Sequence, residues 1–257
     1  MKKHAFVLLL VFGILAGSYI AGHSHVAAPP IPKHATTKPK TVQPKPTVTA
    51  FNKAEFSIDS PASIWVVVNK QRPLNPITYA PNDLVVPNIP LRTGITANEQ
   101  YVRKEMAAAL EGLEAAAKID GVTLNLQSGY RSYTFQEGLY NGYVKQSGQA
   151  QADLESARAG HSEHQTGWAA DLGGVTQPSC NIAQCFGETT EGKWLAANAY
   201  KYGFIIRYTA TKQAITGYEN EPWHVRYVGS KLSQEMFNDN ITTLEEFFGL
   251  PAAPTYN

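Results

Sequence analysis

The sequence carries almost no net charge, and this shortage excludes one class of partner. Its 257 residues include 22 basic and 21 acidic side chains, which gives a formal net charge of only +1. A chain this close to neutral has no overall electrostatic attraction for nucleic acid. We therefore expect no nucleic-acid partner, and we look for specific chemistry in local groups of residues.

Cysteine is scarce as well. The only two cysteines, Cys180 and Cys185, lie in the segment PSCNIAQCF. A zinc ribbon needs two such pairs or accompanying histidines, and neither is present nearby. In an exported chain, two cysteines so close together favour a disulfide over two free thiols. The bond would act locally, by fixing one small loop.

Acidic residues are absent before Glu55, and this part of the chain has two sections. Residues 1–27 combine a short basic start with an apolar run, which predicts an export signal that is either cleaved or kept as a membrane anchor. No cysteine follows the run, which argues against a lipid-modified N-terminus. Residues 28–52 are rich in Pro, Lys and Thr and predict a disordered linker. The rest of the chain is therefore expected outside the cytoplasm, attached to the membrane or associated with the cell wall.

Residues 53–257 are expected to form a single domain, because 43% of the chain is apolar and can supply a packed core. The clearest helix is predicted to begin at Thr96, with Glu99 completing a capping box, and to end at Gly121. A second helix is predicted to begin at Ser132. The class is α+β, with a small central antiparallel sheet flanked by helices. Strands are predicted near 64–68, 122–126, 167–172, 204–208 and 225–228, and further helices near 150–158 and 190–202 and at the C-terminal end.

Three of the seven histidines, His161, His164 and His224, fall in this domain. His164 lies in the segment GHSEHQTGWAAD, which ends at Asp171, and His224 lies three residues after Glu221. Two histidines and a carboxylate are a common ligand set for catalytic zinc, which keeps a fourth position open for water. A carboxylate that is not a ligand must then move the proton of that water, and Glu221 is the natural candidate.

Spacing alone leaves a structural interpretation equally open. A histidine beside a strand usually has an ordinary core or surface role. Asp171 could form an ion pair with Arg131 or Arg226 instead of holding a metal ion. We do not include His161 among the ligands, because three ligands suffice and an open site is needed.

The segments resemble the VanY-type peptidases, which are D-alanyl-D-alanine and L,D-carboxypeptidases related to the VanX dipeptidases. The shared pattern S-x-H-x-x-G-x-A-x-D covers residues 162–171, and E-x-W-H covers residues 221–224. The block SGYRS at 128–132, followed by Gln136, and the upstream stretch SIWVVVNKQRPL also match. The resemblance extends over roughly residues 56–245, and the three blocks at 128–136, 162–171 and 221–224, in the same order as in the family, make it specific. Trp168 replaces a more usual leucine, which changes packing and no polar position.

The resemblance implies a role for each matching residue. His164, Asp171 and His224 would hold one zinc ion, Glu221 would be the general base and acid, and Arg131 would stabilise the oxyanion. The residues implied in substrate binding are Gln136, Ser162, Arg207 and Tyr208.

The implied function is an exported zinc metallocarboxypeptidase that removes the C-terminal D-alanine from peptidoglycan stem peptides. Both D,D and L,D specificity are compatible with the motifs. A monomer is expected, with membrane contact only through an uncleaved N-terminal segment. One alternative is an endopeptidase with the same metal site. A second is a wall-binding zinc module without turnover, which the presence of Glu221 disfavours, and the export signal opposes a cytoplasmic dipeptidase.

Overall fold

The computed structural model describes residues 50–257. The predicted export signal over 1–27 and nearly all of the predicted linker over 28–52 lie outside the described residues. Within residues 50–257, no helix combines the length and the apolar character needed to cross a membrane.

A four-stranded antiparallel sheet with the strand order β3-β4-β6-β5 forms the centre of the fold. Its sequence neighbours β3 and β4 pair with each other, and β6 lies between β4 and β5. This confirms the predicted α+β class with a small antiparallel sheet. The four strands are β3 (Leu124–Ser128), β4 (Ala169–Gly174), β5 (Phe204–Tyr208) and β6 (Glu221–Tyr227).

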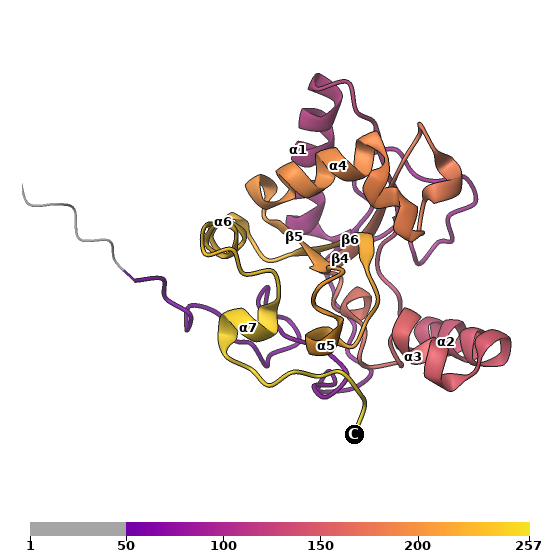
Figure 1. Ribbon diagram of the computed structural model, residues 1–257, viewed down its shortest axis with the longest axis vertical. Helices are drawn as coiled ribbons and strands as arrows, with labels where there is room; N and C mark the ends of the chain where they lie inside the picture. The colour runs from indigo at the N-terminus through magenta and orange to yellow at the C-terminus, as the bar shows by residue number, and fades with distance from the viewer. Residues whose placement is uncertain (1–49) are drawn as a thin grey trace, which may run out of the picture. The chain divides into compact units, whose positions relative to one another are not determined.

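Helices lie on both sides of this sheet (Figure 1). Helices α1 (Lys104–Ile119) and α4 (Thr190–Asn198) lie together on one side, and α2 (Tyr133–Ser147) and α3 (Gln149–Glu155) lie together on another. A 3-10 turn continues α4 as far as Tyr202, before Gly203 at φ 90°. The remaining helices are α5 (Gln213–Thr216), α6 (Ser230–Asn238) and α7 (Leu244–Phe248).

Alternation along β4 separates the core from the functional face. Ala170 and Leu172 belong to the main hydrophobic core, together with Leu110 of α1 and Leu195 of α4. Successive side chains of a strand point to opposite faces, so Asp171 points away from these helices. The pocket described below is lined by Asp171 and therefore lies on the face of the sheet opposite α1 and α4.

The prediction that a helix begins at Thr96 is wrong. Thr96 and Glu99 do form hydrogen bonds with each other, but they close a turn, and α1 begins at Lys104. The carbonyl of Glu99 instead accepts a hydrogen bond from the amide of Gly129. Val102–Arg103 forms β2, which pairs with β1 at Leu84–Val85. These long-range bonds hold the segment extended, so the local capping signal does not decide its structure.

The segment 64–68 is buried as predicted, but it forms no strand. Its side chains alternate between two cores, with Trp65 and Val67 in one and Val66 in the other. Side chains bind its carbonyl groups, while the amide of Val67 donates to the carbonyl of Ile58, which belongs to no strand. The guanidinium of Arg226 donates to the carbonyl of Val66 at 2.9 Å, and that of Arg72 donates to Val67 at 3.1 Å. The hydrophobic run therefore predicted the burial of this segment correctly, but the prediction that it pairs in a sheet is wrong.

Candidate active site

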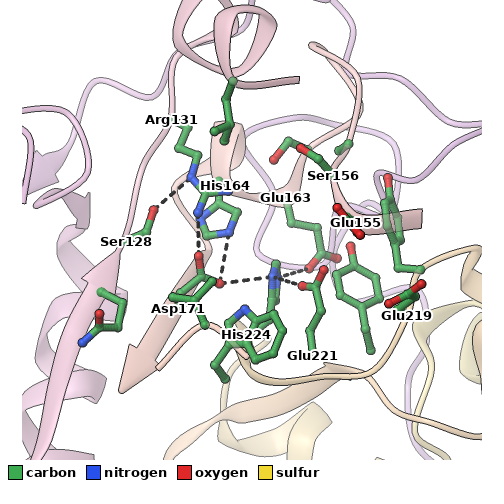
Figure 2. Close-up of a pocket in the computed structure, with 18 of the residues that line it drawn as sticks. Ser128, Arg131, Glu155, Ser156, Glu163, His164, Asp171, Glu219, Glu221 and His224 are labelled. Atoms are coloured by element: carbon green, nitrogen blue, oxygen red, sulfur yellow. Dashed lines mark hydrogen bonds and ion pairs between the residues drawn. The ribbon is translucent and has the colours of Figure 1, made fainter. Parts of the chain in front are cut away.

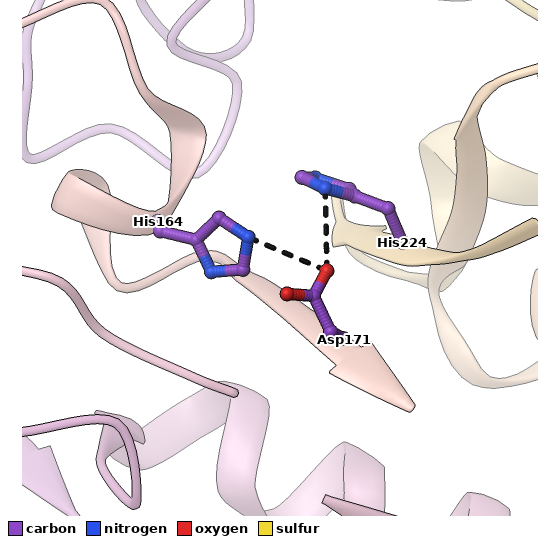
Figure 3. Close-up of side chains that lie close together, drawn as sticks. All are labelled: His164, Asp171 and His224. Carbon is purple, nitrogen blue, oxygen red and sulfur yellow. Dashed lines mark ion pairs between the residues drawn. The ribbon is translucent and has the colours of Figure 1, made fainter. Parts of the chain in front are cut away.

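His164, Asp171 and His224 converge in the pocket (Figure 3). One donor atom from each residue lies within 4.8 Å of the others, and all three side chains are buried. His164 Nε2 lies 3.4 Å from Asp171 Oδ1, and His224 Nδ1 lies 3.5 Å from the same oxygen. His164 and Asp171 come from one segment of the chain, whereas His224 comes from a distant strand that the fold brings beside them.

The sheet sets two of these positions. Asp171 on β4 is the register partner of His224 on β6, and Ser128 on β3 is the partner of Asp171 on the other side. His164 comes from the 3-10 turn Glu163–Thr166 that precedes β4. That turn ends at Gly167 with φ 73°, where a side chain would be strained and a Cβ would lie 2.7 Å from Arg103 Cγ.

The donor set fits a zinc ion. A tetrahedral zinc with bonds of about 2.0–2.2 Å separates its ligand atoms by roughly 3.3–3.6 Å, which matches the two distances to Asp171. Asp171 Oδ1 is buried and has no hydrogen-bond partner among the described residues. A buried carboxylate oxygen without a partner is costly, and a metal ion at this point would satisfy it.

The ring nitrogens on the far side of the two histidines are also engaged. His164 Nδ1 lies 2.7 Å from the carbonyl oxygen of Gly129, and His224 Nε2 lies 3.3 Å from Glu163 Oε2. A hydrogen bond at one nitrogen fixes the tautomer and presents the other nitrogen to the metal. Gly129 must be glycine for this contact, because a Cβ there would lie 2.3 Å from the carbonyl oxygen of Tyr101.

Glu163 is the functional residue that sequence analysis missed. Its side chain is fully buried, and Oε1 accepts from Arg207 at 2.8 Å and from Arg226 at 3.0 Å. These two arginines hold the pKa of Glu163 well below its usual range, although burial opposes them. The family motif allows any residue at this position, so the motif did not identify Glu163. An acidic residue next to His164, together with arginines on two predicted strands, could have suggested a buried ion pair.

This network corrects the prediction that Arg207 binds substrate. Arg207 is 0% exposed, it does not line the pocket, and it also donates to Glu245 at 2.7 Å. Its guanidinium is therefore committed to buried carboxylates behind the site. Tyr208, the next residue, does line the pocket, and its ring centre lies 4.9 Å from that of His224.

The surroundings of the two histidines differ in charge. Burial lowers the pKa of His164, and the charge of Arg131 lowers it further, so the ring is neutral and ready to bind a metal ion. Burial alone would lower the pKa of His224 too. Its hydrogen bonds to Glu163 and Glu221, with the charge of Asp171, instead raise that pKa to about 9.

Glu221 approaches the site through an irregularity in the sheet. A regular strand would place Glu221 and His224 on opposite faces. The register between β5 and β6 shifts between Ile206 and Tyr208, so Tyr208 pairs with Glu221. As a result, Glu221 Oε2 lies 3.3 Å from His224 Nδ1. Burial raises the pKa of Glu221, which suits a group that must both accept and donate a proton.

Arg131 binds the second oxygen of Asp171. Its Nη2 lies 2.6 Å from Asp171 Oδ2, and its Nε donates to Ser128 Oγ at 2.9 Å (Figure 2). The ion pair considered for Asp171 therefore exists, but with Arg131 rather than Arg226. It engages only Oδ2, so it coexists with a metal ion at Oδ1.

The pocket around these residues has a volume of about 620 Å³. Gln136 and Ser162 both line it, as do Arg131 and Glu221. Gln136 is buried and donates from Nε2 to Ser156 and to the carbonyl of Ala157, while its Oε1 has no partner among the described residues. His161 is turned elsewhere, since its Nδ1 lies 2.8 Å from the carbonyl oxygen of Asn69.

Cys180 and Cys185 are joined by a disulfide, with their Cα atoms 5.3 Å apart. The bridge closes a short loop after β4, and three residues of that loop, 182–184, line the pocket. The expected local bond is thus present, and it lies next to the site.

Comparison with known proteins gives a consistent family. A family model described as VanY: D-alanyl-D-alanine carboxypeptidase matches residues 99–230. The putative carboxypeptidase YodJ of Bacillus subtilis is 44% identical over 192 residues, which cover 75% of this chain and 69% of YodJ.

Two solved structures are similar in both sequence and fold. The LdcB LD-carboxypeptidase has a TM-score of 0.69 and 43% identity, covering 74% of this chain and 87% of LdcB. A mutant of the vancomycin resistance D,D-pentapeptidase VanY, in complex with Zn(II), has a TM-score of 0.58 and 30% identity, covering 71% of this chain and 97% of that one. On this evidence the chain belongs to the VanY family of zinc-dependent carboxypeptidases.

Proposed function

We propose that this chain removes the C-terminal D-alanine from peptidoglycan stem peptides, with zinc held by His164, Asp171 and His224. The observation that carries the proposal is the buried Oδ1 of Asp171, which has no hydrogen-bond partner among the described residues. Its distances to the nearest nitrogens of both histidines are those expected between two ligands of one zinc ion. When bound there, zinc supplies Lewis acidity that polarises the scissile carbonyl and activates a water.

Glu221 is the proposed general base and acid. It lies beside the metal ligands, and burial raises its pKa, which makes it a stronger base toward the proton of the attacking water. It then returns that proton to the nitrogen of the leaving D-alanine. The alternative of a wall-binding module without turnover has no use for such a group, so the presence of Glu221 favours the enzyme.

Arg131 is proposed to stabilise two negative charges, those of Asp171 and of the reacting oxygen. Its ion pair with Asp171 orients the carboxylate, so that Oδ1 faces the metal position. Its positive charge also lies in the pocket, where it favours the negative oxygen that develops on the attacked carbonyl. Gln136, Ser162 and Tyr208 line the same pocket and are proposed to position the substrate's terminal carboxylate and last amide.

We propose L,D specificity, in which a tetrapeptide stem loses its last residue. The likeness to the LdcB LD-carboxypeptidase, at 43% identity, exceeds the likeness to the D,D-pentapeptidase VanY, at 30%. Since stem peptides lie outside the cytoplasmic membrane, we also propose that residues 1–27 direct export and that residues 28–52 act as a spacer before a catalytic domain at 53–257. The enzyme is proposed to act as a monomer.

The test is mass spectrometry of defined tetrapeptide and pentapeptide stems incubated with the full-length chain, with and without a chelator. We expect chelator-sensitive loss of one D-alanine, mainly from the tetrapeptide. Preference for the pentapeptide would replace L,D by D,D specificity. Cleavage inside the peptide would identify an endopeptidase, and zinc-loaded protein that cleaves neither stem would refute the proposed reaction.

A further inference from the structure

The loop closed by the disulfide holds Ile182 in an unusual backbone conformation. Its φ is 57°, in the left-handed region, where a β-branched side chain is a clear outlier. Only two non-glycine residues in the part of the chain that the structure describes have a positive φ, and the other is Asn240. Such a conformation persists only where the surrounding structure determines it, and it is often associated with function.

Several bonds hold this loop in place. The disulfide joins its two ends, and the side chain of Asn181 forms two hydrogen bonds with the backbone of Gly174 at the end of β4. On the other side of Ile182, Gln184 donates to Glu219 at 3.1 Å. Glu219 lies in the segment just before Glu221, so the loop is tied both to the strand of Asp171 and to the segment of the proposed base.

The side chain of Ile182 lines the pocket and is 42% exposed. Many of the other residues around the pocket are polar or charged, including Arg92, Gln127 and Glu155. An aliphatic side chain in the wall of a pocket leaves water when an apolar part of a ligand covers it, which favours binding. A pocket of about 620 Å³ is also far larger than the single alanine that leaves, so most of it must receive the peptide on the N-terminal side of the scissile bond.

We infer that Ile182 is a specificity-determining residue that packs against the aliphatic chain of the stem peptide's diamino acid. This inference rests on the proposed function, because it names the part of the stem peptide that the pocket recognises. An aliphatic side chain attracts methylene groups and makes no directional bond, so it distinguishes a long aliphatic residue from alanine. The disulfide loop positions it, and neither takes part in the bond cleavage.

The experiment measures binding and turnover separately, in the zinc-loaded full-length chain. Dissociation constants are obtained by calorimetry in the Glu221→Gln background, for a stem peptide and for its analogue with alanine in place of the diamino acid. We expect tighter binding of the natural stem, and we expect Ile182→Gly to reduce that preference by about 10-fold. Ile182→Val keeps an aliphatic group and should retain most of the preference.

Asn240→Gly is the matched control. It replaces the other left-handed residue, at φ 55° between α6 and α7, and Asn240 does not line the pocket. With this substitution, the preference for the natural stem over its analogue should equal that of the Glu221→Gln protein alone. If Ile182→Gly keeps the full preference, or if the natural stem binds no better than its analogue, the inference is wrong. Turnover by the chain with Glu221 intact tests the proposed reaction independently, because binding is read without it.

Discussion

At the scale of single residues, His224 is held between two carboxylates that face its opposite ring nitrogens. Both carboxylates line the pocket, with Glu221 at Nδ1 and Glu163 at Nε2, where two buried arginines also bind it. Burial raises the pKa of Glu221 and so favours proton exchange, whereas the ion pairs of Glu163 with Arg207 and Arg226 keep it ionised. Substituting them should therefore separate catalysis from metal binding.

Glu221→Gln is expected to keep zinc and lose activity. The amide retains the size of the side chain, but it cannot accept the proton of the attacking water. General base catalysis of this kind contributes roughly 10²–10⁴-fold, so turnover should fall by that amount. Metal analysis and steady-state kinetics on stem peptides check both parts. Turnover close to that of the unaltered chain would remove Glu221 from the proposed mechanism.

Glu163→Gln is expected to weaken zinc binding. Loss of the partner at His224 Nε2 frees the ring, and such changes typically reduce metal affinity by about 10–100-fold. The substitution also leaves Arg207 and Arg226 with less compensating charge, which lowers stability.

Glu245→Gln is the control for that loss of stability. Glu245 is equally buried and pairs with Arg207 at 2.7 Å, but the structure shows no contact between it and His224 among the described residues. Both variants should unfold at lower temperature, and only Glu163→Gln should lose zinc affinity in a competition assay. Equal zinc affinity in the two variants would contradict the positioning role of Glu163.

Zinc affinity is expected to depend on pH through His224. Its pKa of about 9 in the metal-free site means that the ring is protonated at pH 7, and a metal ligand must be neutral. Binding therefore releases a proton, and the apparent affinity should rise by about 10-fold per pH unit as the pH increases toward 9. Chelator competition at pH 6.5, 7.5 and 8.5 measures the slope, and a flat profile would show that His224 is already neutral.

At the scale of secondary structure, the sequence predicted elements well where local and long-range forces agree. The strand at 204–208 follows Gly203 in its left-handed conformation and has the predicted bounds. The helix after Ser132 is capped as expected, because the Ser132 hydroxyl accepts from the amide of Phe135.

Errors arose where distant groups compete for the backbone. The backbone after Thr96 forms hydrogen bonds with the segment after β3, and these override the local capping signal. In the run at 64–68, arginine side chains bind carbonyl groups that a neighbouring strand would otherwise bind. The role of Arg207 was misjudged for a similar reason. Neighbouring letters in a motif do not reveal which side of an irregular strand each side chain occupies, and the register shift near Tyr208 decides this.

Ser132→Ala tests whether the cap of α2 matters to the pocket. Loss of an N-cap hydroxyl costs about 1 kcal/mol of stability. Gln136 lies one turn into this helix and lines the pocket, so KM should rise by a few fold as well. Thr243→Ala removes the corresponding cap from α7, whose residues do not line the pocket, and should lower stability alone. Equal KM values in the two variants would argue against a contribution from Gln136.

At the scale of the whole molecule, zinc should stabilise the fold. The proposed ligands join β4, β6 and the turn before β4, so the site exists only in the folded chain. A ligand present at 1,000 times its dissociation constant adds about 4 kcal/mol of stability. For a domain of this size, that raises the unfolding temperature by roughly 8–16 °C. Calorimetry at several free zinc concentrations checks this. An unfolding temperature that does not change on chelation would contradict a zinc site built from these three parts of the fold.

The pairing of Asp171 with His224 across β4 and β6 also bears on how this protein can change in evolution. A slip of one residue in either strand would turn one of these side chains to the opposite face of the sheet. Insertions or deletions inside the two strands would therefore remove the core pattern and the metal ligands in one event. The segments at 175–189 and 209–220 contain no strand and therefore no such register, and they include residues that line the pocket. We therefore expect changes in length mainly in these segments at the pocket, while the paired strands keep their length and register.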